Sequence, residues 1–445
     1  MRPAMISIAA LGLLTSVVGV SQAAAPAKKD AKPESRSISG AYDLVHQSVF
    51  RPAARAFDVP RLGRKITGHP RESANVDEQD HVRLPSTWWQ PRIGFREVTV
   101  EQMLKGPGSG QGPAPGPWTV TKAKSAGVSA GFQIEDTKGD GFIIKFDPPK
   151  FPEMATGADV IGSYLFWAAG YNVPENTIEW FRRQDLKIGK DATYSDSRGR
   201  KHPITDDYLN ALLARVAPRP DGSYRCVASR YLDGKPIGPF LYSGRRKDDP
   251  EDMIPHELRR ELRGMWTVAA WVNHADARAP NTLDMWVTDG GRSFVRHYLI
   301  DFGSILGSSA LSRRRDYATG FEYYIDYGAM VRMVPTLGLY KPKWENVVDP
   351  EMPAVGFIES KNFDPEDWRP DFPNPAFDER TVRDARWGAW IVSGFTDDHI
   401  RAAVAAAHYT NASVAGYLTR VLIERRDKLV QRWLGTRGPT LITSR

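Results

Sequence analysis

The chain has 445 residues, 41% of them hydrophobic, which is enough to bury a large core in one or two domains. Its formal net charge of +7 suits an anionic ligand or an envelope surface, but no basic run alternates with aromatic residues, so we expect no nucleic-acid partner. The single cysteine, Cys226, excludes an internal disulfide, and its apolar, strand-like surroundings predict a buried thiol and not a nucleophile.

The N-terminus has the pattern of a cleaved secretory signal. Arg2 precedes an apolar run at 5–20, and small residues at 23–25 fit a signal-peptidase site. The run is shorter than the ~20 residues of a membrane-spanning helix, and an uncleaved anchor is the alternative. We therefore expect an exported protein, periplasmic or secreted, with no transmembrane helix in its mature chain. Residues 26 to about 60 are rich in Pro, Lys and Ser, which predicts a mobile linker.

Three strands joined by short turns are predicted after the glycine- and proline-rich segment 106–117. They are expected at 118–124, 132–136 and 142–147, where apolar and polar residues alternate. The small-residue turn at 125–131 contains Gly127 and Gly131, which would let the backbone approach a ligand closely. Alternation places Lys145 on the face of the third strand opposite that of the neighbouring phenylalanines.

A helix is predicted at 156–169, where apolar residues recur at helical spacing. Thr156 suits its N-cap, and Asp159 would then occupy the third helical position, as in a capping box. Two further strands are expected in "NVPENTIEWF" and "SYRCVASRYL", with a short helix near 205–216 between them. A connector rich in Gly and Pro follows at 232–240.

The second half of the chain is predicted to be mainly helical. Apolar stripes predict one long helix from about 255 to 272 and another near the C-terminus. Between them, "LDMWV", "TDGG" and "SFVRHYLI" predict a strand, a tight turn and a strand that ends on Asp301. The expected segments are a signal peptide at 1–25, a linker and N-terminal extension at 26–85, a strand-rich N-lobe at 86–235 and a helical C-lobe at 236–445.

The stretch "HADARAPN" at 274–281 fits the pattern H-x-D-x-x-x-x-N of a phosphotransferase catalytic loop. Phosphoryl transfer requires positive charge at the phosphates, oxygen ligands for a metal and a carboxylate near the acceptor hydroxyl. Asp276 would orient or deprotonate the acceptor, and the Asn281 carboxamide would bind magnesium. Asp301, in "DFG", would hold the metal that bridges the phosphates, and Lys145 would meet those phosphates. The alternative is that all four are ordinary turn and strand residues.

In the order of these motifs the chain resembles the protein-kinase-like superfamily, as a divergent, exported bacterial member. The resemblance covers about residues 118–310. It implies an α+β, bilobal protein-kinase-like fold with a strand-rich N-lobe and a mainly helical C-lobe. It also implies ATP and Mg²⁺ as cofactors, Gly127 and Gly131 in the turn that covers the phosphates, and His274 in the catalytic group as a brace for the loop.

The resemblance implies an acidic residue that holds Lys145, on the helix that follows the strand. Asp159 is the expected partner and Glu153 is the second choice. The chain also departs from the family's pattern. The usual Arg before the catalytic Asp is Ala275, the glycine turn lacks the G-x-G-x-x-G spacing, and no "APE" follows Asp301. An atypical or small-molecule kinase is therefore implied, and a typical protein kinase is not.

The leading hypothesis is an exported ATP- and Mg²⁺-dependent phosphotransferase acting on an unidentified hydroxyl-bearing acceptor, which would be a protein, a glycan or a small molecule. Because the space outside the inner membrane is poor in ATP, a catalytically inactive binding or scaffold protein of the envelope is the second hypothesis. A nucleotidyl transferase, with the nucleotide reversed in the same site, is the third. Residues 320–400 would either line an acceptor site or wrap the helical lobe.

Overall fold

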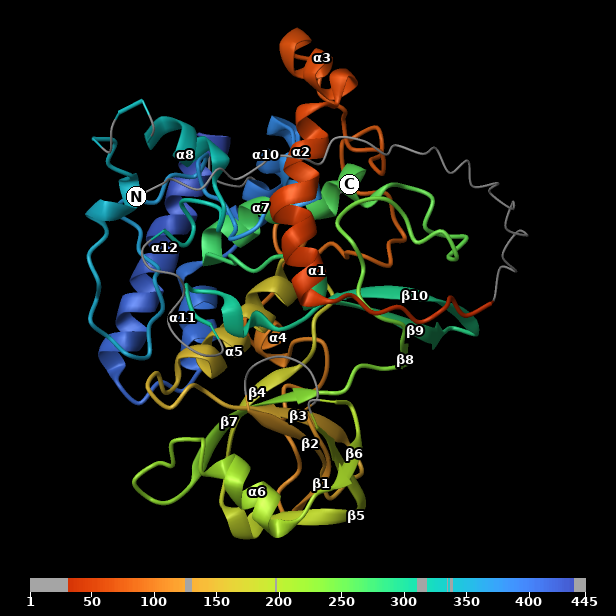
Figure 1. Ribbon diagram of the computed structural model, residues 1–445, viewed down its shortest axis with the longest axis vertical. Helices are drawn as coiled ribbons and strands as arrows, with labels where there is room; N and C mark the ends of the chain where they lie inside the picture. Colours follow the sequence, from red (N-terminus) through yellow and green to blue (C-terminus); the bar gives the residue numbers. More distant parts are fainter. Residues whose placement is uncertain are drawn as a thin grey trace, which may run out of the picture.

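The computed structural model describes residues 31–124, 130–196, 198–309, 318–333, 335–336 and 339–435. The described chain forms two lobes (Figure 1), a strand-rich lobe in the lower half of the view and a larger, mainly helical lobe above it. The predicted α+β architecture, with a strand-rich N-lobe and a mainly helical C-lobe, is confirmed. The predicted signal peptide and Gly127 lie outside the described residues.

The strand-rich lobe is built on a seven-stranded sheet with the strand order β4-β7-β3-β2-β1-β5-β6. Its strands are β1 Trp118–Ala123, β2 Gly131–Glu135, β3 Gly141–Lys145, β4 Asn176–Phe181, β5 Leu186–Ser195, β6 Lys201–Pro203 and β7 Tyr224–Arg230. β1 and β5 run parallel, and the other neighbouring strands are antiparallel. The first three strands agree with the three predicted from sequence alternation.

Side-chain alternation along these strands fills the core of the strand-rich lobe. β3 buries Phe142 and Ile144 and leaves Lys145 on its other face, as predicted. The helix α6, Asp206–Leu213, covers the same core with its apolar side. Cys226 in β7 is fully buried, and burial raises the pKa of its thiol well above the ordinary value. It is therefore a core residue, as predicted.

The helix α5, Met154–Ala168, lies between the two lobes (Figure 1). It packs on β4 and β7 of the sheet and on the short turn η5, Phe302–Ser304, of the helical lobe. The capping box predicted at Thr156 is wrong, because the helix begins two residues earlier. The Thr156 amide and hydroxyl instead donate to the Asp147 carboxylate, at 2.8 and 2.7 Å. This contact ties the end of the β3 segment to the first turn of α5.

The helical lobe is organised around α7, Arg260–Val272, every residue of which is buried. The predicted long helix, hairpin and C-terminal helix are all present. The other elements of the lobe and its small sheet are α4 Val100–Lys105, β8 Lys235–Pro236, β9 Thr282–Asp289, β10 Arg292–Leu299, α8 Tyr327–Met333, α9 Pro375–Asp378, α10 Val382–Ser393, α11 Asp397–Ala405 and α12 Ala412–Leu434. Within the described ranges, no helix has both the length and the apolar character that a membrane span requires.

The predicted mobile linker is instead helical from residue 40. It contains α1 Gly40–Val45, the turn η1 His46–Phe50, α2 Arg51–Ala56 and α3 Val59–Thr67. Ser39 and Asp58 accept backbone hydrogen bonds at the starts of α1 and α3. Composition was misleading because two of the four prolines of the predicted linker belong to helices. Pro60 lies in the first turn of α3, where no N–H donor is needed, and Pro52 lies where η1 continues into α2. An ion pair of 2.8 Å from Arg51 to Asp378 attaches the segment to the helical lobe.

Candidate functional site

Lys145, at the end of β3, brings three of the predicted site residues together. Its ammonium contacts the Asp159 carboxylate on α5, and it lies 3.3 Å from Oδ1 of Asp301, which follows β10. The Lys145 and Asp159 side chains are 13% and 2% exposed, whereas that of Asp301 is 47% exposed. The buried Asp159 carboxylate therefore fixes the Lys145 ammonium beside the accessible Asp301 carboxylate, at the junction of the two lobes.

The Asp159 side chain contacts residues of three other elements, β3, β4 and η5. Its Oδ1 accepts one hydrogen bond from the Asn176 side chain on β4 and one from the Phe302 backbone amide, both at 3.0 Å. Its Oδ2 faces Lys145. Glu153, the second choice as the partner of Lys145, instead contacts the Thr410 amide and hydroxyl near α12. The acid beside the lysine is thus Asp159.

The charges of this cluster change each other's pKa values. Burial alone would lower the pKa of Lys145, but the carboxylates of Asp159 and Asp301 outweigh it and raise that pKa. The attraction of Lys145 lowers the pKa of Asp301, with a further contribution from Lys124. Burial raises the pKa of Asp159, and Lys145 opposes that rise. Asp301, the accessible acid, is accordingly the one held most firmly as a carboxylate.

Lys124, directly after β1, is a site residue that the sequence did not reveal. It is close enough to Asp301 to lower its pKa, and its own pKa is lowered by burial and by repulsion from Lys145. The only signal in the sequence was a lysine placed immediately before the glycine-bearing turn. With Lys145, it gives the site a second ammonium group, which suits phosphate oxygens.

Asp301 has an unusual backbone conformation, with a φ of 61° in the left-handed region. The turn sends the Asp301 side chain toward Lys145 and the next side chain, Phe302, into the core. Phe302 stacks on Phe166 of α5 at 4.9 Å between ring centroids, and His274 contacts both rings at 5.5 and 6.0 Å. His274 is 2% exposed, so it supports the loop from within the core and does not present its ring to the accessible side of the site.

Gly162 on α5 makes this aromatic packing possible, because a Cβ at this position would lie 2.5 Å from Cβ of Phe302. Gly162→Ala should lower the free energy of unfolding by about 1–3 kcal/mol, since the crowding outweighs the gain in helix propensity. Gly416→Ala is the matched control, because this helical glycine in α12 has no atom within 4 Å of the added methyl. It should stabilise by about 0.5–1 kcal/mol. Equal values for the two variants in urea unfolding would contradict the close packing of Phe302 on α5.

The predicted catalytic loop follows α7 directly. The Asn281 side-chain amide donates to the main-chain oxygen of Asp276 at 2.8 Å, which fixes the loop across its five-residue span. The main-chain carbonyl of Asn281 accepts a hydrogen bond from the amide of Ile300, the residue before Asp301, at 3.0 Å. Asp276 is close enough to Asp301 to raise its pKa. The structure therefore brings Asp276, Asn281, Asp301 and Lys145 into one region.

Two residues missed from the sequence hold Asp276 in place. Arg278, inside the quoted motif, donates from Nε to Oδ1 of Asp276 at 2.7 Å. On its other side, Nη1 of Arg278 lies 3.8 Å from Oδ2 of Asp43, a buried carboxylate on α1. α1 packs on the 3-10 turn η4, Ala279–Asn281, of the loop. Asp43 was hidden from sequence reasoning because it lies in the segment taken for a linker.

The oxygen-bearing side chains fit a divalent cation of the magnesium type. The nitrogen of the Asn281 amide is used by Asp276, which leaves its oxygen as the metal-binding atom, and Asp301 adds an accessible carboxylate oxygen. Hard oxygen ligands of this kind suit Mg²⁺. Within the described part of the chain, no group of three or more His, Cys, Asp and Glu residues is placed to hold a metal. Phosphate oxygens and water would therefore have to complete the coordination.

Gly131, predicted for the turn over the phosphates, is the first residue of β2. It pairs directly with Lys145 across the sheet, and a Cβ on it would lie 2.3 Å from the main-chain oxygen of Ile144. The glycine thus allows β2 to approach the lysine-bearing strand closely. The other predicted glycine, Gly127, lies outside the described residues.

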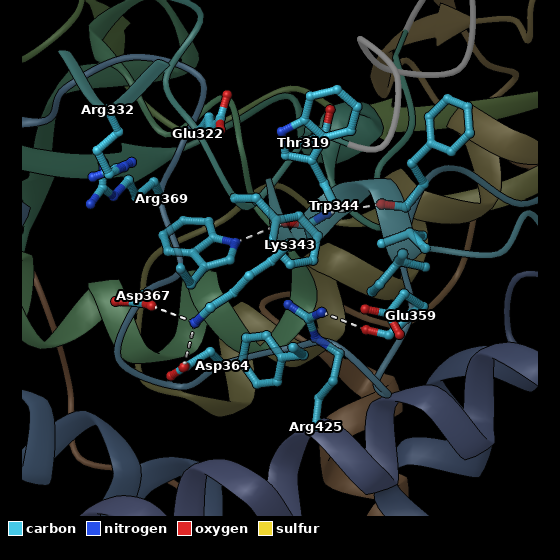
Figure 2. A pocket seen from close by; sticks show the side chains of 18 of the residues that line it. Thr319, Glu322, Arg332, Lys343, Trp344, Glu359, Asp364, Asp367, Arg369 and Arg425 are labelled. Carbon is cyan, nitrogen blue, oxygen red and sulfur yellow. Dashed lines mark hydrogen bonds and ion pairs between the residues drawn. The ribbon is translucent and has the colours of Figure 1, made fainter. Parts of the chain in front are cut away.

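A separate cavity of about 290 Å³ lies within the helical lobe (Figure 2). In its wall, the Trp368 indole donates to the Asn273 side chain at 2.8 Å. The Lys343 ammonium in the same wall contacts Asp364 and Asp367 at 3.2 and 2.7 Å. The described residues predicted for the phosphotransfer site do not line this cavity. Described residues between 320 and 369 supply most of its wall.

No protein-family model matches the chain, and no curated protein matches it. Its structure is similar to a solved structure described as "crystal structure of the Golgi casein kinase with Mn/ADP bound", with 8% identity and a TM-score of 0.35, over 92% of this chain and 97% of that one. A second structure, described as "Crystal structure of the golgi casein kinase", has 8% identity and a TM-score of 0.31, over 92% and 96% of the two chains. At these values the likeness assigns no role to any residue, and the site is defined by contacts within this chain.

Proposed function

We propose that the chain is an exported phosphotransferase of the atypical kinase type, which uses ATP and Mg²⁺ to phosphorylate a hydroxyl-bearing acceptor. The observation that carries the proposal is the position of the Lys145 ammonium between the carboxylates of Asp159 and Asp301, beside the loop that bears Asp276. Phosphoryl transfer needs a lysine positioned by a buried acid, an accessible acid beside that lysine, and a further carboxylate on the catalytic loop.

In this proposal each side chain has one task. Lys145 binds phosphate oxygens, and Asp159 holds the lysine in position from behind. Asp276 orients the acceptor hydroxyl and accepts its proton as the bond from the acceptor oxygen to the γ-phosphorus forms. The bond from that phosphorus to the ADP oxygen breaks in the same transfer, and ADP leaves. Asp301 and Asn281 would hold magnesium, which, when bound, neutralises charge on the phosphates. Because Arg278 and Asp43 fix Asp276, the acceptor side of the site depends on the N-terminal segment.

The test combines nucleotide binding with product analysis. The mature chain should unfold at a higher temperature in MgATP than in Mg²⁺ alone, because the ligand binds only the native state. After incubation with MgATP and candidate acceptors, mass spectrometry should detect an acceptor heavier by one phosphoryl group. An increase of one nucleotidyl group would favour nucleotidyl transfer instead, and no thermal shift with any nucleotide would favour the scaffold hypothesis.

Asp43→Ala should reduce phosphoryl turnover by about tenfold while changing the KM for MgATP little, because it releases Arg278 and so loosens Asp276 but leaves Lys145 and Asp301 untouched. Asp43→Glu should recover part of the loss. Asp58→Asn, at the N-cap of α3 and away from the catalytic loop, is the matched control and should retain full turnover. If Asp43→Ala raised only the KM for MgATP, the proposed link through Arg278 would be wrong.

A further inference from the structure

The helix α3 exposes its apolar side to solvent. Val59, Leu62 and Ile66 recur at spacings of three and four, which places them on one side of the helix. They are 74%, 53% and 77% exposed, and Phe57, just before the helix, is 83% exposed. These four residues, called here the α3 apolar surface, stay uncovered by the rest of the described chain. Figure 1 shows α3 projecting from the top of the helical lobe.

Arg61, on the other side of α3, faces the protein instead. Nε of Arg61 lies 3.2 Å from Oε1 of Glu379, the residue after α9. The preceding helix is attached in the same way, through the ion pair of Arg51 with Asp378. An amphipathic helix on a globular protein normally packs its apolar side inward. Here ion pairs hold the helix in the opposite orientation, with its apolar residues directed outward.

The positive charge near α3 favours an anionic binding partner. Besides Arg61, which is paired with Glu379, residues 59–71 contain Arg64, Lys65 and Arg71 and no acidic residue. Arg71 is exposed and Arg64 is partly exposed. A short helix with an exposed apolar side and neighbouring basic residues is typical of segments that lie in the interface of an anionic bilayer.

We propose that the α3 apolar surface binds the surface of an anionic lipid bilayer. The four apolar side chains insert among the headgroups and upper acyl chains, while Arg64 and Arg71 contact lipid phosphates. The contact is peripheral, since the apolar residues occupy one side of a nine-residue helix. It does not depend on the phosphotransferase activity, because no residue of the candidate site belongs to α3.

Cosedimentation of the mature chain with vesicles tests this inference. The chain should bind vesicles made of equal parts of phosphatidylglycerol and phosphatidylcholine and should bind pure phosphatidylcholine vesicles much more weakly. The double variant Leu62→Glu, Ile66→Glu should lose about tenfold or more in affinity for the anionic vesicles. Val348→Glu replaces another apolar residue that is 76% exposed, and it should bind as the wild type does. Because all three positions are exposed, their thermal midpoints should match that of the wild type.

Three outcomes would overturn the proposal. The first is no binding of the wild type to anionic vesicles, and the second is equal binding by the wild type and the double variant. The third is a wild-type dimer in sedimentation velocity that the double variant converts to a monomer without any vesicle binding by the wild type. That result would assign the α3 apolar surface to a second copy of the chain.

Discussion

Asp301→Asn is expected to reduce phosphoryl transfer by at least about a thousandfold. The variant keeps the size of the side chain and removes the charge that would hold the metal between the phosphates. It should also remove the Mg²⁺-dependent part of the thermal shift with ATP, because the metal would lose its accessible carboxylate. Asp289→Asn removes an exposed carboxylate in the β9–β10 hairpin that pairs with Arg296, and it should leave both measurements unchanged.

The pH dependence of stability gives Asp301→Asn a second readout. Lys145 holds the pKa of Asp301 below its ordinary value of 3.8, so folding is favoured by its ionised form. That contribution is fully present above a pH of about 4 and is lost as the pH falls through the lower, folded-state pKa. The difference in stability between wild type and variant should therefore shrink on acidification in this range. A constant difference from pH 7 to pH 3 would show that Lys145 and Asp301 do not interact.

Asp159→Ala is expected to lower the free energy of unfolding by about 3 kcal/mol and to abolish MgATP binding. The change leaves the Lys145 ammonium without its buried partner and the Phe302 amide without its acceptor. It also removes the shorter of the two hydrogen bonds that the Asn176 side chain donates to residue 159. The lysine would then be free to leave the position in which it meets phosphates. Urea unfolding and calorimetric titration with MgATP measure the two effects separately.

A double-mutant cycle isolates the Lys145 and Asp159 pair in the same experiment. Lys145→Met and Asp159→Ala should each destabilise the chain, and the double variant should be more stable than their sum predicts by about 1–3 kcal/mol. Additive effects would mean that the contact between the two side chains contributes nothing to folding. Lys122→Met is a matched control on β1, and it should change stability by less than about 0.5 kcal/mol because its side chain is exposed.

The strand-rich lobe was predictable because its sequence pattern and its burial agree. The alternation in β3 correctly placed Lys145 opposite the buried phenylalanines. The order of Lys145, the α5 acid, the catalytic loop and Asp301 along the chain also indicated which residues would meet. Sequence spacing alone could not choose between Asp159 and Glu153, since that choice depends on how α5 sits against η5 and β4.

The missed features all depend on contacts between distant segments. Asp43 reaches Arg278 across more than two hundred residues, and Lys124 acts on Asp301 from another lobe. Neither contact leaves a local pattern. The N-terminal helices were missed for a different reason. The Pro, Lys and Ser that predict a linker are concentrated at 26–39, before α1, whereas residues 40–60 contain no Lys and only two Pro. In these helices ion pairs to Asp378 and Glu379 replace the apolar packing that sequence periodicity detects.

A structure of the chain with Mg²⁺ and a non-hydrolysable ATP analogue is the most direct test of the site. The ammonium of Lys145 should lie within hydrogen-bond distance of phosphate oxygens, with an Asp301 oxygen bound to the metal and the terminal phosphate directed toward Asp276. A nucleotide bound elsewhere, with Lys145 and Asp301 making no contact to it, would contradict the phosphotransferase proposal.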